Sequence, residues 1–122
     1  MWEIIASKPY GEWFAVLDEE SKIDIAAIIM LLMEKGPQLG RPFADKLKGA
    51  KTTNLKELRV QSNNHVYRIA FYFDEKRRGL VLTGGDKKGK NEKLFYEKLI
   101  REAEDQISLY KNNKLEVIKW NL

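Results

Sequence analysis

Two neighbouring runs of alternating apolar and polar residues constrain the fold of this chain more than any other feature. Residues 55–61 and 65–73 flank Asn63-Asn64, and asparagine tolerates the positive φ angles of tight hairpin turns. A two-residue turn there predicts an antiparallel hairpin in which Gln61 pairs with Val66 and Arg59 with Arg68. One face of this hairpin is apolar and is expected to face the core. That face carries Leu58, Val60, Tyr67, Ile69, Phe71 and Phe73.

The other face of the predicted hairpin carries Glu57, Arg59, Gln61, Arg68 and Tyr72, and we expect it to be open to solvent. Like charges directly opposite in a ladder cost roughly 0.2–1 kcal/mol, so the Arg59–Arg68 pair calls for an explanation. Two adjacent guanidinium groups suit a phosphate, which each can hold with paired hydrogen bonds. The alternative is that Glu57 neutralises both arginines and that the three are ordinary surface residues.

The N-terminal third predicts a strand followed by a helical hairpin. Residues 2–6 are short, apolar and β-branched, and Ser7 can cap a first helix. Ser21, with Asp24 at the reciprocal position, is expected to start a second helix, which Gly36-Pro37 ends. Apolar residues at helical spacing support both helices. They are Tyr10, Trp13, Phe14 and Leu17 in the first and Ile25, Ile28, Ile29 and Leu32 in the second.

The remaining elements complete a β-α-α-β-β-β-α order. Residues 38–54 are expected to form a loop, with room for one helical turn after Pro42. A third hairpin-connected strand covers residues 79–83 and ends at Gly84-Gly85, and Asn91 caps a long final helix. The predicted fold class is α+β, with a mostly antiparallel sheet, an N-terminal helical hairpin and a C-terminal helix. We expect the helices to cover one face of the sheet.

Length and composition predict one domain over residues 1–110, followed by a tail over residues 111–122 that is an edge strand or a partner-binding segment. The chain has 122 residues, no cysteine and one histidine, His65, which exclude thiolate metal sites and histidine cages. We therefore expect no metal and no cofactor, and we interpret His65 as structural. The sequence contains neither an apolar run long enough for a membrane nor an export signal, which predicts a cytoplasmic protein without membrane contact.

Positive charge is concentrated in the middle of the chain. Residues 36–98 hold fifteen Lys and Arg against seven Asp and Glu, whereas the net charge of the whole chain is +4. This asymmetry favours an anion-binding face, and its alternative is a solvated lysine-rich surface. Tyr96 follows the basic loop at the start of the final helix, where it could stack on a base or transfer a proton, or simply be a half-buried aromatic. The candidate phosphate-binding lysines come from three places. Lys87, Lys88 and Lys90 lie in the loop before the final helix, and Lys56 lies at the start of the first hairpin strand. Lys48 lies in the loop over residues 38–54, beside Arg41, Lys46 and Lys51.

Several short motifs resemble the RelE/ParE superfamily of bacterial toxins, and most of all its HigB branch. They are Leu58-Arg59, Val66-Tyr67-Arg68-Ile69, the strand that ends in Gly84-Gly85-Asp86-Lys87, and Phe95-Tyr96. The resemblance implies a small α+β toxin that cleaves mRNA on the ribosome and stops translation. It also implies a cognate helix-turn-helix antitoxin, through which alone the complex would bind operator DNA.

The same resemblance implies roles for individual residues. Arg68 matches an arginine used on the scissile phosphate, Arg59 a basic position on the neighbouring strand, and Tyr96 a tyrosine early in the last helix. Lys87 and Lys88 stand where the family places basic groups. Glu57 replaces the lysine of RelE-like members, and the terminal histidine of other branches is absent, so the general base is either Glu57 or a lysine whose pKa neighbouring cations lower.

The predicted chemistry is metal-free: the 2′-hydroxyl of the substrate attacks the adjacent phosphate while cations stabilise the developing charge. Two alternatives remain open at this stage. One is a non-catalytic ParE-like toxin that binds DNA gyrase. The other is an inactive relative that only binds an antitoxin.

Overall fold

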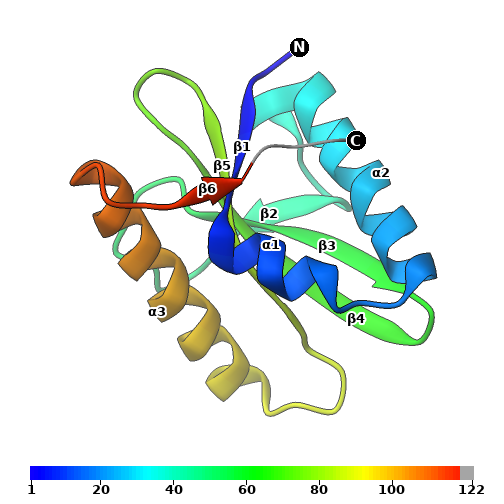
Figure 1. Cartoon of the computed structure of the whole chain (residues 1–122). Helices are drawn as coiled ribbons and strands as arrows, with labels where there is room; N and C mark the ends of the chain where they lie inside the picture. Colours follow the sequence, from blue (N-terminus) through cyan, green and yellow to red (C-terminus); the bar gives the residue numbers. More distant parts are fainter. Residues whose placement is uncertain (119–122) are drawn as a thin grey trace.

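The computed structural model describes residues 1–118 of the chain (Figure 1). In chain order the elements are β1 (Ile4–Ser7), α1 (Lys8–Ala15), α2 (Glu19–Lys35), the 3-10 turn η1 (Gly36–Gln38), β2 (Ala44–Lys46), β3 (Lys56–Ser62), β4 (His65–Phe73), β5 (Gly79–Asp86), α3 (Glu92–Lys111) and β6 (Val117–Ile118). Within these residues no helix is both long and apolar enough to cross a membrane.

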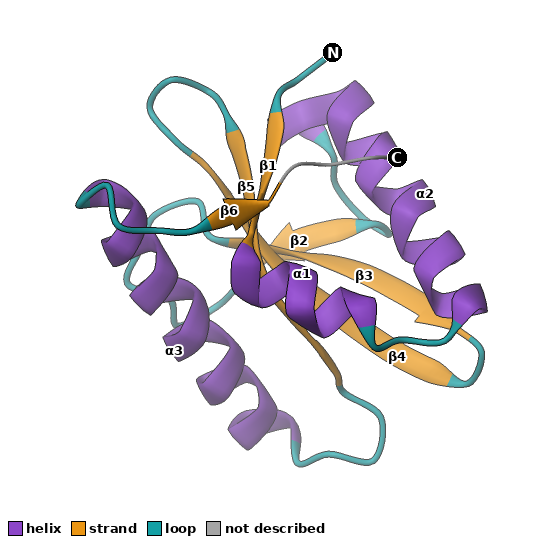
Figure 2. Cartoon of the chain, viewed as in Figure 1, coloured by secondary structure: helices purple, strands orange, loops and turns teal. Residues whose placement is uncertain are grey.

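A mixed sheet runs through the described part of the molecule in the strand order β2-β3-β4-β5-β1-β6 (Figure 2). The first strand, β1, is parallel to β5, and every other neighbouring pair is antiparallel. The predicted α+β class and mostly antiparallel sheet are therefore confirmed. Residues 117 and 118 of the predicted tail form the edge strand β6, whereas Lys119 and Trp120 lie outside the described residues.

The predicted hairpin register is confirmed. Gln61 pairs with Val66 and Arg59 with Arg68 across β3 and β4. Asn63 and Asn64 take φ angles of 47° and 69°, as a turn with two left-handed residues requires. The alternation of side chains then places Leu58 and Val60 in the core and turns Glu57 and Arg59 to the other face.

The expectation that helices cover only one face is wrong. The helices α1 and α2 pack on the face that carries Leu58, Ile69 and Val81, and α3 packs on the opposite face. Figure 1 shows α2 and α3 on opposite sides of the strands. The second face is apolar beyond the hairpin turn, since it carries Leu55, Ala70, Tyr72, Leu80 and Leu82, which pack against Leu99, Ala103 and Ile107. Tyr72, expected in solvent, is consequently buried.

Two helix starts show how well local capping can be predicted. Ser7 caps α1 as expected, since its hydroxyl accepts a hydrogen bond from the Tyr10 amide. The start of α2 differs, because Asp18 is the N-cap and accepts from the amide of Ser21, which lies inside the first turn. Asp24 is not a capping residue but accepts a hydrogen bond from Ser62.

Two strand assignments also differ from prediction. The segment expected to be a loop contains β2, which pairs with β3 at one edge of the sheet. The strand β5 does not stop at Gly84-Gly85 but continues to Asp86. These glycines serve close packing: a Cβ atom on Gly84 would lie 2.5 Å from the ring of Trp13, and one on Gly85 would lie 3.0 Å from that of Phe95.

Candidate functional site

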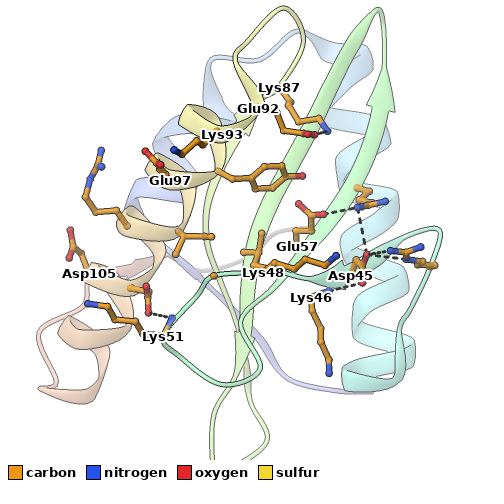
Figure 3. A pocket seen from close by; sticks show the side chains of 18 residues that line it. Asp45, Lys46, Lys48, Lys51, Glu57, Lys87, Glu92, Lys93, Glu97 and Asp105 are labelled. Atoms are coloured by element: carbon orange, nitrogen blue, oxygen red, sulfur yellow. Dashed lines mark hydrogen bonds and ion pairs between the residues drawn. The ribbon is translucent and has the colours of Figure 1, made fainter.

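A cleft of about 880 Å³ lies between α3 and the β2–β3 edge of the sheet (Figure 3). The loop that follows β2 forms one wall and α3 forms the other. Glu57, Arg59 and Tyr96 line it together with Lys87 and Lys48. Five of the residues singled out from the sequence therefore meet at one site.

Glu57 lies at the centre of the charged residues at this site. One carboxylate oxygen, Oε2, accepts a 2.9 Å hydrogen bond from Nε of Arg59, and the other, Oε1, lies 3.7 Å from Nε of Arg68. Glu57 is 2% exposed, whereas the Arg59 side chain is 35% exposed and also contacts Asp45. The hydrogen bond to Glu57 raises the pKa of Arg59 further, so this guanidinium is a permanent cation at the floor of the cleft.

Arg68 lies opposite Arg59, as predicted, but not on an open face. It is 9% exposed and donates from Nη1 to the Tyr67 carbonyl and from Nε to the Tyr96 hydroxyl. The covering helix α3 explains this burial, because Tyr96 extends from its first turns. Arg68 therefore lies behind Glu57 and Tyr96, and the predicted pair of solvent-facing arginines is wrong.

Tyr96 forms part of the boundary between the buried network and the cleft. Burial, and then the neighbouring Glu57 carboxylate, raise the pKa of its hydroxyl. The phenol is therefore protonated at neutral pH and can donate a proton or a hydrogen bond. Nζ of Lys87 lies 5.5 Å from the centre of the Tyr96 ring and donates to Glu92 at 2.9 Å.

The remaining predicted lysines lie in three different places. Lys48 lines the cleft, whereas Lys88 and Lys90 are exposed in the loop before α3, and Lys90 borders a smaller cavity of about 320 Å³. Lys56 points to the opposite face of β3, where its ammonium donates to the Pro37 carbonyl, so its assignment to the site is wrong. The alternation of strand residues could have predicted this, since Glu57 and Lys56 are neighbours.

Five further cations line the cleft without having been assigned to the site from sequence. Arg41, Lys46 and Lys51 come from the β2 side, and Lys93 and Arg101 come from α3. The spacing of Lys46, Lys48 and Lys51 was a usable signal only if β2 had been recognised. Among residues 1–118, no group of three or more His, Asp or Glu side chains is arranged to hold a metal ion.

Asp86 fixes the path of the loop that carries Lys87. Its Oδ1 accepts from the amides of Val66 and Lys88, and its Oδ2 lies 2.6 Å from Nδ1 of His65. Burial alone would raise the pKa of Asp86, but the hydrogen bonds from Val66, His65 and Lys88 lower it. His65 also stacks on Tyr67. The structural interpretation of His65 therefore agrees with its contacts.

Comparison with known proteins adds the family. Residues 12–108 match the family described as phage derived protein Gp49-like (DUF891). The chain belongs to this family. This Gp49-like protein is 38% identical over 94 residues to the Mycobacterium tuberculosis H37Rv protein named "Putative toxin HigB3", a match that covers 77% of the chain and 80% of that relative.

A second relative from the same organism is named "Putative toxin HigB2". It is 38% identical over 88 residues, which cover 71% of this chain but only 44% of that protein. The chain thus spans less than half of this second relative. No solved structure matches the chain. The HigB resemblance of the sequence motifs agrees with the names of both relatives.

Proposed function

We propose that this Gp49-like protein is the toxin of a toxin–antitoxin system and that it inhibits translation by cleaving mRNA on the ribosome. Its similarity to two proteins named as HigB toxins supports the first part. One observation carries the second: a carboxylate, a guanidinium and a phenol meet at the floor of a lysine-lined cleft. Those are the groups that metal-free RNA cleavage needs.

The proposed reaction is an in-line attack of the substrate's 2′-oxygen on the adjacent phosphorus. The O2′–P bond forms, the P–O5′ bond breaks, and the products are a 2′,3′-cyclic phosphate and a 5′-hydroxyl. Arg59, which is charged and about a third exposed in the cleft, stabilises the phosphoryl oxygens. Tyr96 takes the 2′-hydroxyl proton while it passes its own to Glu57, which solvent hardly reaches. Water or a ribosomal group supplies the proton to the leaving 5′-oxygen.

In this proposal Arg68 is a positioning residue. Its contacts with Tyr96 and Glu57 orient both groups, and its burial keeps it away from the phosphate. Lys87 and Lys48 line the cleft on either side of this centre and bind neighbouring phosphates. The acid–base set within the chain is incomplete, so we expect the ribosome to orient the substrate.

The proposed partners follow from the same assignment. A cognate antitoxin with a helix-turn-helix domain would neutralise the protein, and only the complex of the two would bind operator DNA. Neither a cofactor nor a metal takes part in the proposed step.

The test is induction of the protein in a bacterial host, with growth and the 5′ ends of cellular mRNA as readouts. We expect growth arrest with new internal mRNA ends, and loss of both in Arg59→Ala and Tyr96→Phe by about a hundredfold or more. Lys56→Ala is the matched control, because Lys56 lies on the same strand as Arg59 but on the other face. Arrest with DNA damage and intact mRNA would indicate a gyrase inhibitor instead. Harmless expression would indicate an inactive relative.

A further inference from the structure

One wall of the cleft is a loop that a single carboxylate ties to α3. We call residues 46–52, which begin at the last residue of β2, the basic strap, since they include Lys46, Lys48 and Lys51. Oε2 of Glu104 on α3 accepts hydrogen bonds from the amide of Lys51 at 2.9 Å, the amide of Thr52 at 3.0 Å and the hydroxyl of Thr52 at 3.3 Å. Together with Leu47, which is buried, and Ala50, which packs against the same apolar cluster, these contacts hold the strap against the helix.

The two walls of the cleft differ in charge. Among the described residues, the three lysine side chains of the basic strap form no ion pair, and Figure 3 shows Lys48 in the middle of the view with Lys46 and Lys51 below it. The facing surface of α3 alternates in sign at every fourth residue, through Lys93, Glu97, Arg101 and Asp105. Its charges therefore cancel locally. Excess positive potential belongs to the strap wall.

The more exposed apolar side chains belong to the other wall, since Leu47 of the strap also lines the cleft but is buried. Tyr96 and Ile100 come from α3 and line the cleft between the charged residues of the helix. A single-stranded nucleic acid presents charged phosphates on one side and stackable bases on the other. The division of the cleft fits this ligand in one orientation, with its phosphates along the basic strap and its bases toward Tyr96 and Ile100.

We propose that the basic strap is a phosphate-binding subsite for single-stranded RNA, separate from the Glu57–Arg59 centre, and that Glu104 is the positioning residue that holds it in place. This inference rests on the proposed function, because it assumes that the cleft binds RNA. Glu104 acts through the backbone of Lys51 and Thr52 and does not contact the ligand itself. A negative charge in the cleft thus promotes the binding of an anion.

The direction in which RNA affinity changes when Glu104 loses its charge therefore tests the proposal. Removing a carboxylate from a cleft that binds a polyanion strengthens binding if charge alone matters. Asp105→Asn removes one such charge from a residue that lines the same cleft but does not hold the strap, so it should leave affinity unchanged or slightly higher. Glu104→Gln removes the same charge and loosens the strap. We expect it to weaken binding of a short oligouridine by about threefold to tenfold.

The measurement is fluorescence-anisotropy titration of the labelled oligouridine at several salt concentrations, with hydrogen exchange at the amides of Lys51 and Thr52. The inference predicts faster exchange at both amides in Glu104→Gln and a smaller salt dependence of binding. Binding by Glu104→Gln that equals or exceeds that of the wild type would overturn it, and so would weaker binding with unchanged exchange. Lys48→Ala and Lys51→Ala serve as further variants if Glu104→Gln folds poorly. Each should reduce the salt slope by about 0.7 if its lysine contacts a phosphate, and unchanged slopes in both would also overturn the inference.

Failure of the proposed function would look different. Wild-type protein that neither binds the oligouridine nor cleaves mRNA, with Arg59→Ala indistinguishable from it, would remove the basis for both. If the wild type binds the oligouridine and cleaves mRNA, and Glu104→Gln binds equally well despite faster amide exchange, only the role of Glu104 is refuted.

Discussion

Two arginines on adjacent strands share the carboxylate of Glu57, and the burial of these three residues decides what each can do. Glu57 and Arg68 are almost fully covered, and of the two arginines only Arg59 lines the cleft. Removing one member of a buried ion pair leaves the other charge uncompensated, which costs more than losing a contact at the surface. The two opposed arginines therefore differ in kind: Arg68 supports the fold and the site, and Arg59 is available to a ligand.

This difference predicts the order of two stability losses. Arg68→Ala should lower the free energy of unfolding by about 2–4 kcal/mol, because Glu57 and Tyr96 lose a buried partner. Arg59→Ala should cost less, about 1–2 kcal/mol, because its own side chain is a third exposed, although it also removes the hydrogen bond to Glu57. Urea denaturation measures both. Adding Glu57→Gln to Arg68→Ala should recover part of the loss, and equal losses for the two arginines would contradict this account.

At the scale of elements, Gly84 and Gly85 set the distance between β5 and the helices on either side of the sheet. The Trp13 ring of α1 lies against Gly84, and the Phe95 ring of α3 lies against Gly85. The same two glycines were expected to end the strand, because glycine weakens strands in general. Close packing by aromatic side chains from two helices overrides that preference, and such packing cannot be recognised from local sequence.

Gly84→Ala should therefore destabilise the protein more than Gly85→Ala. The added Cβ at position 84 would meet an aromatic ring at 2.5 Å, so α1 must shift, and we expect a loss of about 1–3 kcal/mol. At position 85 the nearest contact is 3.0 Å, which a small movement of Phe95 can relieve. Thermal unfolding of the two variants measures the difference. A loss at position 85 as large as that at position 84 would contradict the argument.

A second element-scale contact joins the β4–β5 turn to the C-terminal end of α3. Asp74 accepts hydrogen bonds from Tyr110 and from Arg78. Burial acts to raise the pKa of Asp74, but these hydrogen bonds and the charge of Arg78 lower it overall. Burial, and then Asp74, raise the pKa of Tyr110 to about 12, so its phenol remains a donor at neutral pH.

Tyr110→Phe should lower stability by about 1–2 kcal/mol near pH 7. Asp74 holds its proton more weakly in the folded than in the unfolded chain. Its contribution to the free energy of unfolding is therefore complete above about pH 4. That contribution is lost as the pH falls through the lower folded value. The difference between wild type and Tyr110→Phe should therefore shrink in acid, as urea denaturation across that range would show. In an Asp74→Asn background, Tyr110→Phe should have a much smaller effect.

At the scale of the whole molecule, one sheet separates two apolar cores. Trp2 and Trp13 pack against the core under α1 and α2, whereas Leu99 belongs to the core under α3. The strands β4 and β5 contribute to both cores. The two cores should therefore unfold together.

Leu99→Ala tests this coupling. Leu99 is buried, so its truncation should cost about 2–5 kcal/mol, whereas Leu109→Ala on the exposed side of the same helix should cost much less. Tryptophan fluorescence and far-ultraviolet circular dichroism should shift to the same lower midpoint in Leu99→Ala. A tryptophan transition that stays at the wild-type midpoint would show that the cores unfold independently.

The features that the sequence predicts and those that it does not are separated by how far apart in the chain the contacting residues lie. Hairpin register, the cap at Ser7 and the core face of the hairpin depend on contacts close in sequence, and the structure confirms them. The strand β2 depends on its pairing with β3, and the second covered face and the burial of Arg68 depend on where α3 packs, which no local pattern specifies. The cleft brings together five of the predicted residues, whereas Lys56, Lys88 and Lys90 lie outside it and the depth of Arg68 was not predicted.

The position of β6 has a practical consequence for experiments on the site. This strand lies at the edge of the sheet opposite β2, the strand that borders the cleft, and its Val117 side chain is half-exposed. The chain contains no cysteine, so Val117→Cys would provide a unique thiol for attaching a dye or a surface linker. A molecule tethered or labelled there would keep the cleft unobstructed, and the proposed binding of RNA could be measured on the same preparation.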